Sequence, residues 1–135
     1  MFVDACVIIS IIADEETAAA YETALAHAGT AFTSPLAAWE AIVVLSRSDH
    51  LDCSYAAAEA VVVEWLETRQ IPLRDPGSPR EVLSHAVAVA ARHGLGKRHL
   101  SNFDCFHYAY AKSMGVPLLT LDRLLRDTDV ETLPA

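Results

Sequence analysis

The sequence lacks the residues and runs that mark several classes of protein. Its three cysteines form no C-x-x-C pair, which argues against a zinc ribbon or a dithiol redox site. Ten basic residues against 18 acidic ones give a net charge of −8, so the chain cannot coat DNA or an anionic membrane through bulk positive charge. No apolar run is long enough to span a bilayer, and the apolar run at residues 5–13 has no basic segment before it, as a signal peptide would. We therefore expect a cytoplasmic protein with reduced cysteines and no membrane association.

The sequence does have a large apolar fraction and an uneven distribution of charge. With 53% hydrophobic residues, a chain of this length can bury one core, and we expect a single domain over residues 1–135. Residues 92–126 carry six basic side chains against two acidic ones, whereas the chain before them is strongly acidic. Such a segment can offer a local basic face to a phosphate backbone, although a solvated helix face is the more common reason for one.

Short apolar strands alternate with helical segments along the whole chain. Apolar periodicity, caps and stops predict helices at residues 5–13, 15–28, 35–47, 54–69, 79–93 and 102–114. Short strands are expected at residues 2–3, 31–33, 71–73, 116–121 and 128–133. The segment Ser78-Pro79-Arg80-Glu81 is typical of a capping box with proline at the first helical position. Because parallel strands need crossovers, this alternation predicts a three-layer α/β/α fold with a short-stranded parallel sheet flanked by helices.

Two acidic residues stand where strands end. Asp4 follows Phe2-Val3, and Asp122 follows the strand that ends at Leu121, so both are expected at the carboxyl edge of the sheet, where ligands bind in such folds. Either residue could instead cap the helix that follows it, which is the more common role of an Asp at that position.

Glu40 and Asp104 need a different explanation. The helical neighbours of Glu40 are apolar and none is basic, so an arginine from elsewhere, a hydrogen-bond network or a cation has to offset its desolvation. Asp104 is in the first turn of a helix, where the dipole favours an acid, but a basic loop at residues 96–99 precedes it and an apolar run follows. Four acids from separate segments could meet in one cleft, and oxygen ligands with few histidines select Mg²⁺ or Mn²⁺ over zinc. A zinc site at Cys105 and His107 would lack its other ligands.

These segments together resemble the PIN-domain ribonucleases, and most closely the VapC-type toxins of prokaryotic toxin–antitoxin pairs. The four pieces that carry the resemblance are Met1-Phe2-Val3-Asp4-Ala5-Cys6, Thr33-Ser34-Pro35-Leu36-Ala37-Ala38-Trp39-Glu40, Asp104-Cys105-Phe106-His107-Tyr108-Ala109 and Pro117-Leu118-Leu119-Thr120-Leu121-Asp122. The chain departs from the family pattern at Asn102, which is one place closer to the third acid than in many relatives. It departs again at Cys6, where a Ser or Thr hydroxyl is common; Ser34 could replace that hydroxyl. Asp129 is the reserve candidate for the fourth acid.

The resemblance implies a Mg²⁺- or Mn²⁺-dependent endoribonuclease that hydrolyses RNA phosphodiester bonds at a four-carboxylate site. Asp4, Asp104 and Asp122 are then the metal ligands. Glu40 completes the catalytic set and orients the attacking water, accepts its proton or bridges to a second metal.

Contacts to RNA and to partner proteins are implied as well. Arg92, Lys97 and Arg98 are the candidate phosphate contacts because their loop leads into the third acid, and Ser34 is a further candidate RNA contact. The family also implies a homodimer, and a VapB-type antitoxin whose helix covers the apolar helix at residues 56–66 and excludes the substrate.

Aromatic side chains are a further candidate means of holding RNA. Trp39 and Tyr108 could stack on an unpaired base, although such residues are more often part of the core.

Other function classes keep part of this pattern. A catalytically inactive PIN-fold module that only binds a partner protein would use the same acids as helix caps. A phosphohydrolase with Asp4 as nucleophile is disfavoured, because no second acid follows two residues later. Nucleotide binding is disfavoured because neither G-x-G-x-x-G nor G-x-x-x-x-G-K occurs.

Overall fold

A short parallel sheet forms the centre of the protein in the computed structural model, which describes residues 1–135. Strands β1 (Phe2–Val3), β2 (Leu118–Leu119) and β3 (Thr132–Leu133) lie in that order, each parallel to its neighbour. β1 and β2 are fully buried, which agrees with the wholly apolar sequences of parallel strands covered on both faces.

The sheet continues beyond β1 only as isolated pairs. Phe2 pairs with Phe32, and Thr33 pairs with Leu73, so the strands expected at 31–33 and 71–73 are each reduced to bridge residues. The expected strand at 116–121 likewise keeps only two residues. Proline explains part of this shortening, because residues 72 and 117 are prolines and have no N–H to donate to a neighbouring strand.

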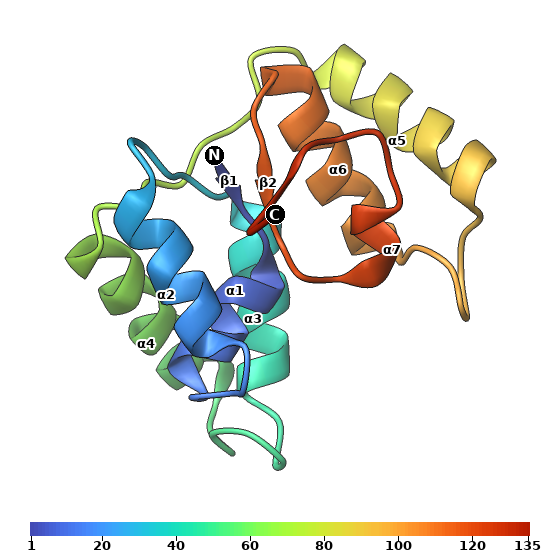
Figure 1. Ribbon diagram of the computed structural model, residues 1–135. Helices are drawn as coiled ribbons and strands as arrows, with labels where there is room; N and C mark the ends of the chain where they lie inside the picture. Colours follow the sequence, from blue (N-terminus) through green and yellow to red (C-terminus); the bar gives the residue numbers. More distant parts are fainter.

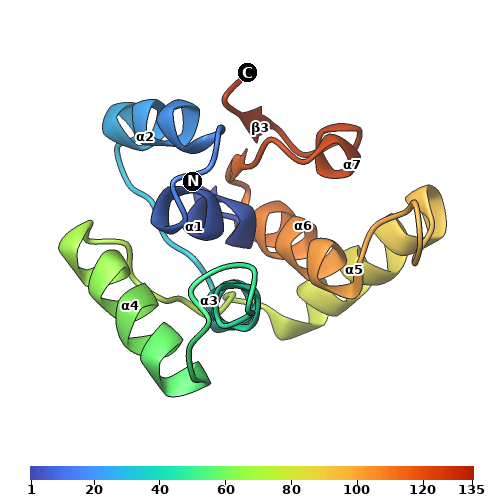
Figure 2. The same ribbon diagram turned by 90° about the horizontal axis from the view of Figure 1, so that it is seen from below.

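Seven helices surround the sheet. They are α1 (Ala5–Ile12), α2 (Ala18–His27), α3 (Pro35–Leu45), α4 (Tyr55–Thr68), α5 (Pro79–His93), α6 (Asn102–Met114) and α7 (Arg123–Arg126). Figure 1 shows α1 to α4 gathered on one side of β1 and β2, with α5 and α6 on the other side. Figure 2 shows the same molecule from below, with α1 between α2 and α3, against both of which it packs. The predicted α/β/α fold is therefore confirmed, and none of its helices is long and apolar enough to cross a membrane.

Local signals fix most of the helix ends. Helices α3 to α6 each begin after a serine whose hydroxyl accepts a hydrogen bond from the N–H three residues later. At Ser78 only this half of the expected capping box forms, because the Glu81 carboxylate makes no return bond. The complete capping box is at Ser101 and Asp104. α6 ends at Gly115, whose φ of +63° is a left-handed conformation that glycine adopts without strain.

One of the largest fully buried side chains in the core is an imidazole, that of His107. Phe2, Ile8, Leu45 and Leu119 are all fully buried, and so is His107 on α6. A buried imidazole without a partner would be unfavourable, so its surroundings need an explanation.

Candidate functional site

Asp4 lies at the carboxyl end of β1, and its side chain does not cap the helix that follows. It occupies the N-cap position of α1, yet its carboxylate accepts no hydrogen bond from that helix. Instead, Oδ2 accepts hydrogen bonds from the Thr120 hydroxyl at 2.8 Å and from the Cys6 thiol at 3.0 Å. Asp4 is only 3% exposed, so these two donors fix one of its oxygens inside the protein.

Cys6 and Tyr21 extend this network to α2. The Cys6 sulfur lies 3.3 Å from the Tyr21 hydroxyl oxygen, which accepts a hydrogen bond from the N–H of Leu121. Cysteine has no hydroxyl to offer at this position, but its thiol reaches Asp4 directly. Ser34 does not replace the missing hydroxyl: it is fully buried, and its side chain caps α3.

Asp122 behaves in the opposite way to Asp4, although both follow a strand. Its Oδ1 accepts hydrogen bonds from the N–H groups of Leu124 and Leu125, so it is a true cap of α7. Its own N–H donates to the Thr120 hydroxyl oxygen, which also contacts Asp4. One buried threonine therefore connects the two acids.

The capping box holds the Asp104 side chain in place, and the negative charges of Asp4 and Asp122 act on its carboxylate. Its Oδ2 accepts the Ser101 N–H at 2.9 Å. Burial raises the pKa of the Asp104 carboxyl above its usual value, the hydrogen bonds from Ser101 act in the opposite direction, and the negative charges of Asp4 and Asp122 raise it further. The carboxylates of Asp4, Asp104 and Asp122 therefore lie close enough to repel one another. A cation bound between them would turn this repulsion into attraction.

Glu40 has a partner that sequence reasoning missed. Its Oε2 lies 2.6 Å from Nε2 of His107, and the same nitrogen lies 3.7 Å from Oδ1 of Asp4. Burial alone would lower the pKa of His107, but the hydrogen bond to Glu40 and the nearby charges of Asp4, Glu40 and Asp104 raise it above its usual value. The available signal was the position of His107 three residues after Asp104, which places both on neighbouring parts of one helix face.

The remaining predicted residues form no hydrogen bond or ion pair with this group of acids. Arg92, Lys97 and Arg98 are exposed and form no ion pairs. Asn102 is exposed at the start of α6. Asp129 lies outside the group and instead accepts hydrogen bonds from the Tyr108 hydroxyl at 2.6 Å and from Lys112 at 2.9 Å.

Ser34 and the two aromatic candidates also have definite places. The complete burial of Ser34 does not fit the predicted contact with RNA. Tyr108 is part of the core, whereas Trp39 is 46% exposed and packs its ring against Tyr55 of α4.

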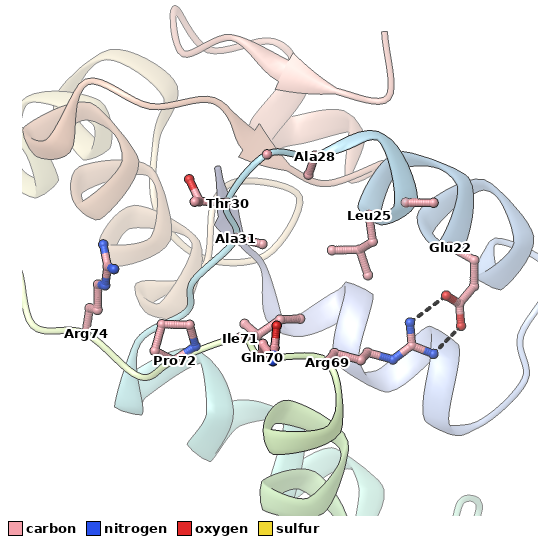
Figure 3. Close-up of a pocket in the computed structure, with 12 residues that line it drawn as sticks. Glu22, Leu25, Ala28, Thr30, Ala31, Arg69, Gln70, Ile71, Pro72 and Arg74 are labelled. Atoms are coloured by element: carbon pink, nitrogen blue, oxygen red, sulfur yellow. Dashed lines mark hydrogen bonds and ion pairs between the residues drawn. The ribbon is translucent and has the colours of Figure 1, made fainter.

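A pocket of about 460 Å³ lies away from these acids (Figure 3). Its wall includes Thr30 and Ile71, which precede the bridge residues of the sheet and so lie at the amino ends of the strands. The ion pair between Glu22 and Arg69 closes one side and joins α2 to the end of α4. In parallel sheets the reactive edge is the opposite one, where Asp4 and Asp122 stand.

The donor set at the carboxyl edge suits a divalent cation. Asp4, Asp104 and Asp122 each use one carboxylate oxygen for hydrogen bonds within the fold, and the other oxygen accepts none. No lysine or arginine pairs with these acids or with Glu40. Asp4, Glu40 and His107 each place one ligand atom within 4.8 Å of the other two. Free carboxylate oxygens without basic partners are the ligands that Mg²⁺ and Mn²⁺ prefer.

Comparison with known proteins agrees with this arrangement. Residues 1–131 match the family model described as PIN domain. The structure of PAE2754 from Pyrobaculum aerophilum is similar to this chain with a TM-score of 0.61 and 23% identity, over 96% of this chain and 85% of that one. FitAcB from Neisseria gonorrhoeae is similar with a TM-score of 0.59 and 17% identity, over 97% of this chain and 94% of that one. No curated protein matches the sequence. At these identities the two structures share the fold with this chain.

Proposed function

The chain belongs to the PIN domain family, and we propose that it is a metal-dependent endoribonuclease whose catalytic residues are Asp4, Glu40, Asp104 and Asp122. The observation that carries the proposal is the gathering of acids at one sheet edge with only His107 to offset their charge. Like charges are stable together in a partly buried site when a cation joins them.

Each acid has a role that follows from its free oxygen. Asp4, Asp104 and Asp122 hold Mg²⁺ or Mn²⁺ through the oxygens that the fold leaves without partners. The cation, when bound, supplies positive charge that orients the scissile phosphate and makes water more acidic. Glu40 reaches the group from α3, and its Oε1 remains free to hold a water molecule while Oε2 is bound to His107.

The last turn of α5 and the loop between α5 and α6 provide the RNA contacts in this proposal. Arg92, Lys97 and Arg98 are exposed, and their charges are not used in ion pairs. The loop is ordered by hydrogen bonds, since Gly96 donates to Leu100 and accepts from His99 through the backbone. It leads directly into Ser101 and the capping box, so phosphates bound there lie next to Asp104.

The chain is further proposed to be the toxin of a VapBC-type pair, active as a cytoplasmic homodimer and inhibited by a VapB-type antitoxin. Supporting this, α4 leaves apolar side chains in solvent: Tyr55 is 60% exposed and Val61 is 39% exposed. Trp39 on α3 continues the same surface. Exposed apolar groups gathered on adjacent helices are typical of a protein-binding surface.

Cleavage of RNA by the purified chain tests the nuclease. We expect total RNA or tRNA to be cut in Mg²⁺ or Mn²⁺, and cleavage to be lost with EDTA and in Asp104→Asn. Asparagine keeps an acceptor for the Ser101 N–H and removes the charge, so the helix start is preserved. Asp52→Asn is the matched control, because Asp52 is exposed in a turn with φ +49°, which asparagine tolerates. Equal cleavage by wild type and Asp104→Asn would contradict the proposed site.

The exposed surface on α3 and α4 also favours a second candidate, a catalytically inactive PIN-fold module that binds a partner protein. Under that function the purified chain would neither cut RNA nor bind a divalent ion. Calorimetric titration with Mn²⁺ separates the two, since only the nuclease needs the ion.

A further inference from the structure

We infer that Asp4, Glu40 and His107 form a cation site with an imidazole ligand, which accepts a divalent transition-metal ion such as Mn²⁺ in preference to Mg²⁺. The inference rests on the proposed function in that Asp4 belongs to both ligand sets. It differs from an all-carboxylate site in its nitrogen donor and in the metal that this donor selects.

The three ligand atoms already lie at distances that one ion can bridge. Nε2 of His107 is 2.6 Å from Oε2 of Glu40 and 3.7 Å from Oδ1 of Asp4. Two ligands at right angles around an ion with bonds of about 2.1 Å are about 3 Å apart, and opposite ligands are about 4 Å apart. The 3.7 Å between His107 and Asp4 falls between these values, whereas the 2.6 Å between His107 and Glu40 is a hydrogen-bond distance that lengthens when an ion replaces the proton. All three atoms lie within 4.8 Å of one another.

Hydrogen bonding within the protein leaves this group incomplete. Nε2 of His107 can satisfy Glu40 with its one proton, but Oδ1 of Asp4 is then too far away for a hydrogen bond. Asp4 is 3% exposed, and Oδ1 is the one of its two carboxylate oxygens that accepts no hydrogen bond from the protein. An ion between the three residues gives each of them a partner: the Nε2 proton of the imidazolium leaves to solvent, and the neutral ring keeps its other proton on Nδ1.

His107 is held in place by packing. The residue is fully buried, and its ring lies near the rings of Phe2 and Phe103 at centroid distances of 6.0 and 6.4 Å. Its Nδ1 is buried with no hydrogen-bond partner, so the aromatic neighbours and Glu40 alone keep Nε2 aimed at the carboxylates. A fully buried imidazole aimed at two acids suits a metal that accepts nitrogen, because Mg²⁺ strongly prefers oxygen ligands.

Electron paramagnetic resonance of the wild-type chain with Mn²⁺ alone tests the site directly. Loss of the free-ion signal reports binding, and electron spin-echo modulation reports a ligating nitrogen. We expect bound Mn²⁺ to show nitrogen coupling that changes when the histidines are labelled with ¹⁵N. We also expect Mg²⁺ to compete at least tenfold more weakly than Mn²⁺.

Two variants identify the residue. His107→Asn should lose the nitrogen coupling and weaken Mn²⁺ binding at least tenfold, whereas His27→Asn, a histidine removed from an exposed position on α2, should keep both. If His107→Asn fails to fold, Glu40→Gln replaces it: that variant keeps a hydrogen-bond acceptor for His107 and should weaken Mn²⁺ binding while retaining the coupling.

The outcomes separate this inference from the proposed function. Tight Mn²⁺ binding without nitrogen coupling overturns the imidazole ligand and leaves the carboxylate nuclease intact. Nitrogen-coupled Mn²⁺ in a chain that cuts no RNA supports the site and contradicts the nuclease. Absence of any Mn²⁺ binding overturns the site and also the metal dependence of the proposed reaction.

Discussion

Thr120→Val tests whether the hydroxyl of Thr120 holds the acidic centre together. Thr120 is fully buried; its hydroxyl donates to Asp4 at 2.8 Å and accepts the N–H of Asp122 at 3.1 Å. Valine has the same shape, so the substitution removes the hydrogen bonds and changes little else. After it, only the thiol of Cys6, a weak donor, reaches Oδ2 of Asp4.

The expected loss follows from these contacts. A hydrogen bond to a charged group contributes about 1.5–3 kcal/mol. The additional buried methyl group of valine returns less than about 1 kcal/mol. We therefore expect the free energy of unfolding to fall by about 2 kcal/mol, which is roughly a 30-fold change in the ratio of folded to unfolded protein.

Urea unfolding in EDTA, followed by circular dichroism, measures this loss without a contribution from bound metal. The slope of the transition should be unchanged. Thr23→Val is the control, because Thr23 is exposed on α2 and its hydroxyl donates only to the Ala19 carbonyl of its own helix. A loss below about 0.5 kcal/mol in Thr120→Val would refute the reasoning, since it would mean that the buried carboxylate does not depend on this hydroxyl.

Two further predictions concern pH and helix capping. The Tyr108 hydroxyl and Lys112 lower the pKa of Asp129 to about 2, so its contribution to stability is present above the unfolded pKa of about 4 and is lost as the pH falls from about 4 to about 2. Asp129→Asn should therefore be less stable than wild type at pH 6, by about 1 kcal/mol or less because the residue is exposed, and equally stable at pH 2. Urea unfolding midpoints at the two pH values measure this difference in stability. A difference that persists unchanged at pH 2 would contradict the prediction. Ser101→Ala should lower thermal stability by about 1 kcal/mol, because it removes the hydroxyl that accepts the Asp104 N–H at 3.0 Å, while the bond from the Ser101 N–H to Asp104 remains; the loss should exceed that in Ser78→Ala, whose hydroxyl accepts at 3.3 Å, and a melting temperature equal to that of wild type would count against the capping account.

Helix α6 shows how far local sequence signals reach. The spacing predicted a helix over residues 102–114, and the structure has the same bounds. Ser101 and Gly115 set those bounds through hydrogen bonds and a backbone conformation that involve only nearby residues. The strands were less predictable, because a strand exists only where another strand pairs with it. The expected strand at 116–121 therefore kept only the two residues that have partners on both sides.

Asp4 and Asp122 show where local signals end. Both stand between an apolar strand and a helix, so the sequence alone offers each the same two roles. In the structure Asp122 caps its helix, whereas Asp4 does not, because Thr120 and Cys6 donate to its carboxylate. Thr120 is 116 residues away from Asp4 along the chain, so no spacing rule links the two residues.

Exposure was also decided by packing between helices. Trp39 follows an apolar pattern typical of core residues, yet it is 46% exposed, and the ring that it packs against, Tyr55 of α4, is itself 60% exposed. Tyr108 on α6 has a similar pattern and is buried.

By itself, the sequence determined the order of helices α1 to α6, the family resemblance and the four acids that the proposed function uses. These features depend on side-chain type and on neighbours a few residues away, which a single chain displays directly. Helix α7 and the reduction of two expected strands to bridge residues appeared only in the structure. The tertiary structure alone decided that His107 of α6 meets Glu40 of α3 and faces Asp4. Glu40 and His107 are 67 positions apart along the chain, and they meet because helices α3 and α6 pack against each other. Once packing excludes water, it decides which polar groups become hydrogen-bond partners.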